Sequence, residues 1–403
     1  MYISREIEAK LDSYLRQFKV VLVTGPRQTG KTTMLKHCLS EGYEYTTLDD
    51  LNELDLAISD PKAFLNAERI PIIVDEVQQA PDLFRQTKLV VDALDEYGAV
   101  VLTGSQTYQL MQGVSESLAG RVGILEMSGL SLREVLGRNS STPYVPKQLN
   151  KRDLSAPANL DVWTHIQRGS MPRLQSPEVD WYDYYASYTK SYLERDVRQL
   201  INLKDERKFH SFMIATAART GQLLNATDIA DTIDIDVKTV QGWLSVLEAS
   251  GIVHIMQPFW ANASKRLAKT PKIYFMDTGL ACHLTGWNTP EQLRLGAMSG
   301  HMFETFVVSE VLKSYMNAGR DTRGVSFYRD SRKREIDLVI QDGRTIHPVE
   351  IKAGVQVRQD AVRNFKCLED MSGYEVGFGH VICRTDEPYL ITADVQAVPI
   401  WAI

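Results

Sequence analysis

The first 140 residues alternate between short apolar or β-branched runs and stretches with helical periodicity. The runs occupy residues 20–23, 43–48, 70–74 and 99–102, and a helical pattern covers residues 34–39. Short runs that are apolar throughout are typical of strands buried on both faces of a parallel sheet. The pattern predicts an α/β domain over residues 1–140, with helices covering both faces of the sheet.

A glycine-containing loop follows the first run. Residues 25–32 have the spacing Gly-x-x-x-x-Gly-Lys-Thr, after a predicted strand and before a predicted helix. Glycine lets the backbone turn successive N–H groups toward a phosphate, and the positive end of the helix dipole adds to the attraction. Lys31 would reach the β- and γ-phosphates, and the Thr32 hydroxyl would bind Mg²⁺. The residues predicted to hold a nucleoside triphosphate are Gly25, Pro26, Arg27, Gln28, Thr29, Gly30, Lys31, Thr32 and Thr33.

Later runs end in polar residues that we expect beside this loop. Asp75 and Glu76 follow the third run, and Ser105 follows the fourth. The carboxyl ends of parallel strands gather at the sheet edge where ligands bind. We expect Asp75 to hold Mg²⁺ through water, Glu76 to polarise the attacking water, and Ser105 to sense the γ-phosphate. Asp49 and Asp50, after the second run, are expected to cap a helix rather than to bind Mg²⁺.

Arg121 follows Gly120 near the end of this domain. Arginine stabilises charge on a transferring phosphoryl group, either in cis or from a neighbouring subunit. An ordinary surface ion pair is the other interpretation, and the sequence favours neither. A role in trans would require a homo-oligomer.

Taken together, residues 25–33, 74–78, 102–105 and 118–121 resemble a large prokaryotic family of AAA-type ATPases. That family is allied to the signal-transducing STAND ATPases. The resemblance implies a P-loop NTPase core of the AAA type, with ATP and Mg²⁺ as cofactors.

The middle of the chain is predicted to be mostly helical. Residues 141–204 would form a helical linker or lid, in which a helix over residues 181–203 contains Leu-Glu-Arg-Asp at 193–196, another match to the family. We expect its tyrosines to pack in a core rather than to stack on bases. Residues 205–275 have the order helix, turn, helix, strand, strand, which predicts a winged helix-turn-helix.

The second helix of that module is a poor candidate for reading DNA. Its exposed side includes Asp236 and Glu248, which phosphates repel. A more basic set is predicted on the wing: Lys265, Arg266, Lys269 and Lys272. In STAND-like ATPases such a module follows the nucleotide state, so we favour a mechanical role over groove recognition.

Residues 276–403 predict a second α/β domain. A helix over residues 300–312 carries Glu304, and strands are predicted at 325–329, 334–340 and 345–353, with Asp-Gly in the hairpin turn. Because side chains alternate along a strand, Glu350 and Lys352 share a face, and Asp337 on the preceding strand can share it too. Three carboxylates and a lysine could bind a hard divalent metal and activate water.

This set, Asp337, Glu350 and Lys352 with Glu304, resembles the PD-(D/E)xK nucleases, whose fold is restriction-endonuclease-like. The resemblance implies that Asp337 and Glu350 are metal ligands, that Lys352 orients or activates water, and that Glu304 is an accessory acid. Basic residues that flank the set suit a phosphodiester backbone, and we expect DNA rather than RNA. They are Arg329, Arg332, Lys333, Arg334, Arg358 and Arg363.

Composition adds limits. The chain has 403 residues, which suggests two or three domains, and a net charge of −6, so any nucleic-acid contact needs a local basic patch. Its four cysteines are scattered and fit a reducing cytosol. The first residues do not form a signal peptide and no apolar run is long enough to span a bilayer, so a cytoplasmic protein without a membrane contact is expected.

Three hypotheses follow. The first is an AAA-type ATPase whose nucleotide cycle controls a Mg²⁺-dependent nuclease domain. The second is an ATP-dependent regulatory or signalling switch whose C-terminal domain only binds a partner or nucleic acid. The third is a DNA-binding transcriptional regulator, against which the acidic second helix counts. The complete set of Asp337, Glu350 and Lys352 favours the first over the second.

Overall fold

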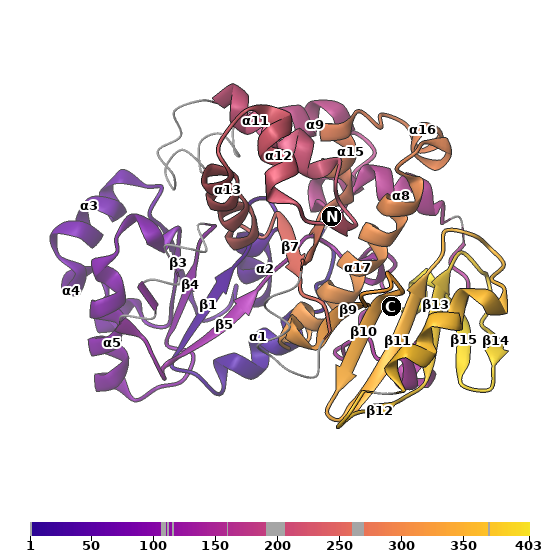
Figure 1. The fold of residues 1–403 in the computed structure, drawn as a ribbon. Coiled ribbons are helices and arrows are strands. Elements are labelled where there is room, and N and C mark those ends of the chain that lie inside the picture. Colours follow the sequence, from indigo (N-terminus) through magenta and orange to yellow (C-terminus); the bar gives the residue numbers. More distant parts are fainter. Residues whose placement is uncertain are drawn as a thin grey trace. The chain divides into compact units, whose positions relative to one another are not determined.

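The computed structural model describes residues 2–105, 110, 113–114, 117–158, 160–190, 206–259, 270–369 and 371–403. The chain divides into two units, each drawn in Figure 1. The first contains Met1–Leu130, Ala249–Gly251 and Met316–Arg320. The second contains Ser131–Glu248, Ile252–Tyr315 and Asp321–Ile403.

A parallel five-stranded sheet forms the centre of the first unit. Its order is β2-β3-β4-β1-β5, and every adjacent pair is parallel. The strands are β1 (Val20–Thr24), β2 (Glu44–Thr47), β3 (Ile72–Asp75), β4 (Val100–Thr103) and β5 (Val122–Glu126). The first four were predicted. The sequence analysis did not predict β5, because Gly123 and Glu126 interrupt its short apolar run.

Helices cover both faces of this sheet, as predicted. Leu22 of β1 packs in one cluster with Phe64 and Phe84, whereas its neighbour Val23 packs in a second cluster with Leu11 and Leu35. Alternate residues of one strand therefore meet different helices. The helices are α1 (Glu8–Leu15), α2 (Lys31–Cys38), α3 (Leu51–Ser59), α4 (Pro61–Phe64) and α5 (Asp82–Leu94), with the 3-10 turns η1 (Ala67–Arg69) and η2 (Val77–Gln79).

Asp50 is the N-cap of α3, as the sequence predicts. Its carboxylate accepts hydrogen bonds from the backbone N–H groups of Asn52 and Glu53. Asp49 accepts a bond from the side-chain amide of Gln79 at 2.8 Å. These acids therefore serve local structure.

The second unit is rich in helices, which lie both before and after its small sheet. They are α7 (Leu132–Val135), η3 (Pro146–Lys151), α8 (Val162–Arg168), η4 (Pro172–Gln175), α9 (Trp181–Tyr188), α11 (Glu206–Ala217), α12 (Ala226–Ile233), α13 (Val237–Ala249), α15 (Thr278–Thr285), α16 (Pro290–Leu295) and α17 (Ser299–Asn317). Tyr184, Tyr185 and Tyr188 of α9 are buried, so they form a core face and not a stacking platform, as expected. The Leu-Glu-Arg-Asp segment at 193–196 lies outside the described residues.

A small antiparallel sheet follows the helix pair α12 and α13. Its order is β6-β8-β7, from β6 (Gln222–Leu223), β7 (Val253–Met256) and β8 (Lys272–Phe275). Val240, Leu244 and Leu247 form the buried side of α13. The segment between β7 and β8 that includes Lys265, Arg266 and Lys269 lies outside the described residues.

A seven-stranded mixed sheet forms the C-terminal part of this unit. Its order is β14-β15-β13-β11-β10-β9, with β12 paired to β11. Strands β9, β10 and β11 are antiparallel, whereas β11, β13 and β15 are parallel. The strands are β9 (Val325–Arg329), β10 (Glu335–Asp342), β11 (Thr345–Ile351), β12 (Glu375–Val376), β13 (Gly379–Cys383), β14 (Tyr389–Thr392) and β15 (Val395–Pro399), with η6 (Thr322–Gly324), η7 (Gln359–Leu368) and η8 (Ile400–Ala402).

Different helices cover the two faces of the mixed sheet. Val349 of β11 packs in one cluster with Val307 of α17, whereas Ile346 of β11 packs in another with Val362 and Phe365 of η7. The strand pattern thus separates a face toward α17 from a face toward η7.

Candidate functional site

The phosphate loop connects the end of β1 to the start of α2. Gly25 has φ +137°, and a Cβ atom there would lie 2.1 Å from the carbonyl oxygen of Met127. Gly30, at φ +93°, is the left-handed N-cap residue of α2. Only glycine tolerates both the conformation and the close approach at position 25. The motif therefore folds as the turn into a helix that phosphate binding requires.

The predicted loop residues differ in exposure. Lys31 is buried, and its Nζ donates to the carbonyl oxygens of Gly25 at 2.9 Å and Pro26 at 2.8 Å. The ammonium thus lies over the loop that would receive the phosphates. Of the predicted set, Gly25, Pro26, Thr29 and Lys31 are buried, Arg27, Gly30 and Thr32 are half-buried, and Gln28 and Thr33 are exposed.

Thr32 and Asp75 meet beside the loop, although β4 lies in the sheet between β1, which leads into the loop, and β3, which ends at Asp75. The Thr32 hydroxyl donates to Asp75 Oδ2 at 2.7 Å, and the Tyr45 hydroxyl donates to the same oxygen at 3.0 Å. Burial and the Asp75 carboxylate raise the pKa of Tyr45, which therefore stays a neutral donor. A hydroxyl and a carboxylate oxygen side by side are hard ligands of the kind that Mg²⁺ prefers. The donor set fits this ion.

Glu76 begins the turn after β3 in a left-handed conformation, with φ +55°. Its backbone N–H donates to Asp75 Oδ1 at 3.0 Å, and its carboxylate accepts a bond from the side chain of Gln78. A Cβ at Gly104, at the end of β4, would lie 2.1 Å from Gln78 Oε1. Gln78 therefore contacts the residues that follow β3 and β4. The sequence analysis assigned no role to Gln78.

Ser105 contacts the phosphate loop through an arginine. Arg27 Nε donates to Ser105 Oγ at 3.2 Å, and Ser105 is buried. The hydroxyl after β4 is therefore beside the loop, where the sheet order places it.

Arg121 lies at the other edge of the sheet. Val20 of β1 pairs with Val122 of β5, so Arg121 precedes the start of β5, while the phosphate loop follows the end of β1. The five residues of β1 span about 15 Å. Arg121 pairs with Asp92 through two bonds of 2.6 and 2.9 Å. The position contradicts a role in cis, and an ion pair or a role in trans remains.

Arg5 is a residue of this site that sequence reasoning missed. Its guanidinium donates to the carbonyl oxygens of Thr29 and Ser128 at 2.8 Å each, and the side chain is buried. It connects the phosphate loop to the chain after β5. No motif includes Arg5, so the sequence contained no signal for it.

Residues 150–153 read Asn-Lys-Arg-Asp, the spacing of a guanine-binding signature. The segment lies in the second unit, at the end of η3, and does not follow a strand of the nucleotide sheet. Asp153 accepts the backbone N–H of Ser155 at 3.0 Å and pairs with Arg138 at 3.3 Å. The segment therefore matches the guanine-binding signature in its spacing but not in its place in the fold.

In the C-terminal sheet, Asp337 and Glu350 lie on adjacent antiparallel strands. Leu338 pairs with Val349, so the next position places Asp337 opposite Glu350. Lys352 Nζ lies 2.7 Å from Glu350 Oε1 and 3.7 Å from Asp337 Oδ2. The three side chains therefore share one face, as the strand pattern predicts.

Burial changes the protonation of these carboxyl groups. Burial and the nearby Glu304 raise the pKa of Asp337 to about 6. Burial and the Asp337 charge raise the pKa of Glu350 to about 8. Burial alone would lower the pKa of Lys352, but Asp337 and Glu350 outweigh it and raise that pKa. The two carboxyl groups therefore favour a positive charge beside them, whether it is a bound proton, the Lys352 ammonium or another cation.

The Glu304 carboxylate, although near enough to act on Asp337, is bonded to other side chains. Its Oε1 accepts bonds from Lys272 Nζ and the Tyr274 hydroxyl, both at 2.8 Å. Lys272 is 3% exposed, so it cannot present its charge on a wing surface, and that prediction is wrong. It is a residue of β8 that points into the domain.

The fit to a divalent metal is therefore partial. Among the described residues, no three Asp, Glu, His or Cys side chains are arranged to hold a metal ion. However, Glu350 Oε2 is buried and accepts no hydrogen bond. Mg²⁺ often binds one or two carboxylates and keeps several waters. Asp337 and Glu350 fit such a site, whereas the predicted third ligand, Glu304, is bound elsewhere.

Not all the predicted flanking cations are free. Arg329 pairs with Glu335, and Arg334 pairs with Asp330 at 2.7 Å. The other four are exposed and form no ion pair with a described residue. They are Arg332, Lys333, Arg358 and Arg363.

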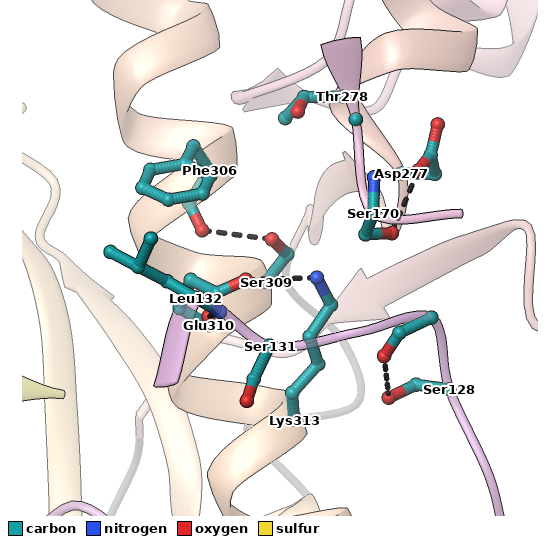
Figure 2. Close-up of polar contacts among 12 residues, drawn as sticks. Ser128, Ser131, Leu132, Ser170, Asp277, Thr278, Phe306, Ser309, Glu310 and Lys313 are labelled. Atoms are coloured by element: carbon teal, nitrogen blue, oxygen red, sulfur yellow. Dashed lines mark hydrogen bonds and ion pairs between the residues drawn. The ribbon is translucent and has the colours of Figure 1, made fainter. Parts of the chain in front are cut away.

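Figure 2 draws further polar contacts, among them those of Glu310 and Asp277 in the second unit. Glu310 accepts the backbone N–H of Leu132 at 2.6 Å and pairs with Lys313 at 2.8 Å. Asp277 accepts both the N–H and the hydroxyl of Ser170, at 2.6 and 2.7 Å. These bonds hold α7 and α15 in place.

No helix among the described residues is long and apolar enough to cross a membrane.

Three family descriptions match this chain. Residues 17–136 match the AAA domain, residues 159–291 match a domain of unknown function (DUF8612), and residues 299–403 match another (DUF4143). The first match agrees with the phosphate loop and the parallel sheet. Residues 17–136 are thus an AAA-type ATPase domain.

Whole-chain relatives add little about activity. "Uncharacterized protein Rv2008c" of Mycobacterium tuberculosis is 29% identical over 354 residues, which cover 86% of this chain and 73% of the relative. Among solved structures, the Walker-type ATPase paby2304 of Pyrococcus abyssi is 16% identical, with 70% of this chain and 96% of that chain covered and a TM-score of 0.46. A STAND protein with a tetratricopeptide repeat sensor from Pyrococcus horikoshii is 11% identical, with 79% and 47% covered and a TM-score of 0.27.

Proposed function

We propose that the N-terminal domain binds ATP with Mg²⁺ and hydrolyses it. The observation that carries this proposal is the 2.7 Å bond between Thr32 and Asp75 beside a glycine-turned phosphate loop. Loop N–H groups and Lys31 would hold the phosphates, and Thr32 and Asp75 would hold Mg²⁺. When bound, the ion neutralises charge on the phosphates. Glu76 would accept a proton from the attacking water.

Two further residues complete the proposed nucleotide site. Ser105, through Arg27, would respond to the γ-phosphate. Arg121 would act in trans, because its position at the opposite sheet edge leaves it unable to reach its own nucleotide. This role implies a homo-oligomer in which Arg121 reaches a neighbour's γ-phosphate.

We propose that residues 276–403 form a PD-(D/E)xK nuclease-like domain that acts on nucleic acid, with DNA preferred to RNA. The order α17, three antiparallel strands β9–β11, η7 and the parallel strand β13 supports this fold. Asp337 and Glu350 would hold Mg²⁺, and Lys352 would orient or activate water. The four unpaired cations near this set supply attraction for phosphates.

We infer a mechanical role for residues 205–275. The order α11, β6, α12, α13, β7, β8 supports a winged helix-turn-helix. Asp236 caps its second helix by accepting the N–H of Thr239 at 3.0 Å, so an acid lies where a DNA-reading helix usually meets phosphates. The module would follow the nucleotide state rather than read a groove.

The alternative is an ATP-dependent switch whose C-terminal domain binds nucleic acid or a partner without cleaving it. One observation favours it: Glu304 is held by Lys272 and Tyr274 and leaves only two carboxylates for a metal. The two functions share the ATPase domain and differ only at the C-terminal site.

The ATPase proposal is tested with Lys31→Ala. We expect ATP hydrolysis to fall at least about a hundredfold, because the ammonium that meets the β- and γ-phosphates is removed. Lys36→Ala is the matched control, since Lys36 lies on the same helix over the ring of Tyr45. Equal hydrolysis by the wild type and Lys31→Ala would refute the phosphate-loop assignment.

The nuclease proposal is tested with Asp337→Asn and Lys352→Ala in a plasmid-nicking assay with Mg²⁺ or Mn²⁺ and ATP. We expect nicking by the wild type, none by either variant, and unchanged ATP hydrolysis. Asp360→Asn, an exposed acid of η7, is the control. If the wild type cuts neither DNA nor RNA, the switch is the better account.

A further inference from the structure

Lys272 occupies an unusual position for a lysine. Its side chain is only 4% exposed, and its ammonium lies 2.8 Å from Glu304 and 2.7 Å from Glu335. It also lies over the ring of Phe327, 5.5 Å from the centroid. A buried charge is tolerated when it is paired on several sides, and these contacts provide that pairing.

The partners of Lys272 come from different elements. Lys272 belongs to β8, Glu304 to α17 and Glu335 to β10. The lysine is part of the segment matched by one family and both acids belong to the segment matched by another. The small sheet β6-β8-β7 therefore contributes a charge to the C-terminal carboxylate site.

That charge remains on the lysine. Burial alone would lower the pKa of Lys272, but Glu304, Glu335 and Asp337 outweigh it and raise the pKa above its usual value. The same ammonium also acts on Asp337, whose ionised form it favours. Lys272 is thus within electrostatic reach of both Glu304 and Asp337.

We propose that Lys272 is a positioning residue of the C-terminal site: it holds the Glu304 carboxylate in an ion pair, so that Glu304 does not serve as a third ligand beside Asp337 and Glu350. With the lysine in place, the site offers two carboxylates and the buried, unbonded oxygen Glu350 Oε2 to a divalent cation. Without it, Glu304 would be free to become a third ligand. The inference rests on the proposed function of this domain and adds the residue that sets its cation affinity.

The charge of Lys272 determines whether its removal raises or lowers the affinity for divalent cations. A fixed positive charge beside the site repels an incoming cation, and it also occupies the carboxylate that would complete the ligand set. Replacing Lys272 by methionine keeps a long unbranched side chain but removes the ammonium. We therefore expect divalent cations to bind more tightly to Lys272→Met.

The experiment measures the affinity for Mn²⁺ alone, and electron paramagnetic resonance distinguishes the free ion from the bound ion. The chain of 403 residues carries Asp75→Asn in every sample, so that the nucleotide site contributes no binding. We expect Lys272→Met to bind Mn²⁺ at least about tenfold more tightly than the parent. Lys208→Met, which removes a surface lysine paired with Asp234, is the matched control and should leave the affinity unchanged.

A loss of folding in Lys272→Met is addressed by two further variants. Lys272→Met combined with Glu304→Gln removes both charges of the pair, and it should bind Mn²⁺ with the affinity of the parent, because the third ligand is gone. Lys272→Arg should also keep the parent's affinity. Equal Mn²⁺ affinity in the parent and Lys272→Met, or tight binding that persists in the double variant, would overturn the proposal.

The measurement needs neither nucleotide nor nucleic acid. A wild type that does not cut DNA would refute the nuclease proposal while the Mn²⁺ comparison still decides the role of Lys272. The two failures are therefore distinguishable.

Discussion

At the phosphate loop, the groups that would meet a ligand are mainly backbone atoms turned by glycines, whereas at the C-terminal site they are side chains that already neutralise one another. The first site follows from one continuous motif and two strand ends. The second takes its charges from β8, α17, β10 and the end of β11. The difference teaches that backbone sites are sensitive to shape, and side-chain sites to charge and protonation.

Exchanging glycine for alanine in each region tests this contrast most strongly. Gly25→Ala places a methyl group against the Met127 carbonyl in an unfavourable conformation, and we expect a loss of more than about 3 kcal/mol in the free energy of unfolding. Gly343→Ala, at φ +66° in the β10–β11 turn with open space around it, should cost only about 1 kcal/mol.

Calorimetry checks both glycine variants, with ATP added to the wild type to recognise the transition of the nucleotide domain. Similar losses in the two variants would show that the phosphate loop has no special shape requirement.

A charge change at the nucleotide site should affect turnover and leave ATP affinity intact. Glu76→Gln removes the proposed base, so we expect hydrolysis to fall about a hundredfold while the dissociation constant of ATP stays within about threefold. Single-turnover hydrolysis and fluorescent-nucleotide titration measure the two quantities. Glu41→Gln, an exposed acid after α2, is the control; a large loss of ATP binding in Glu76→Gln would contradict the assigned role.

The carboxylate site should make the free energy of unfolding depend on pH. Glu350 has a pKa of about 8 in the folded chain, against about 4.3 when unfolded. The folded state therefore holds a proton that the unfolded state releases, and the free energy of unfolding falls as pH rises between these values. Glu350→Gln lacks this proton, so we expect it to gain about 1 to 3 kcal/mol relative to the wild type between pH 5 and 8.5.

Urea unfolding at several pH values measures that difference. Parallel stability curves for the wild type and Glu350→Gln would show that Glu350 titrates normally.

The smallest effect is expected at Arg121. Its ion pair with Asp92 is at the surface, so Arg121→Ala should change the melting temperature by no more than about 2 °C. Hydrolysis per chain should fall only at protein concentrations where the wild type self-associates, because the arginine would act on a neighbour. A loss of hydrolysis in dilute, monomeric protein would contradict a role in trans.

The contrast also explains what the sequence could predict. Residues 25–32 are contiguous and Asp75 ends an apolar run, so the nucleotide site and most of its sheet followed from local patterns. Asp337, Glu350 and Lys352 followed from strand alternation and one hairpin. Lys272 was placed on a wing surface, since nothing local distinguishes a lysine paired with Glu304, 32 residues away, from an exposed one. Arg5 was missed for the same reason, because the carbonyl groups that accept its hydrogen bonds are distant in the sequence.

The position of Arg5 bears on how the ATPase domain is isolated. The family match starts at residue 17, yet the guanidinium that joins the carbonyls of Thr29 and Ser128 lies twelve residues earlier. A fragment trimmed to the match would lose that tie and leave two buried acceptors without a donor. Truncation studies should therefore keep the N-terminal segment, or a weakened fragment will be mistaken for an inactive enzyme.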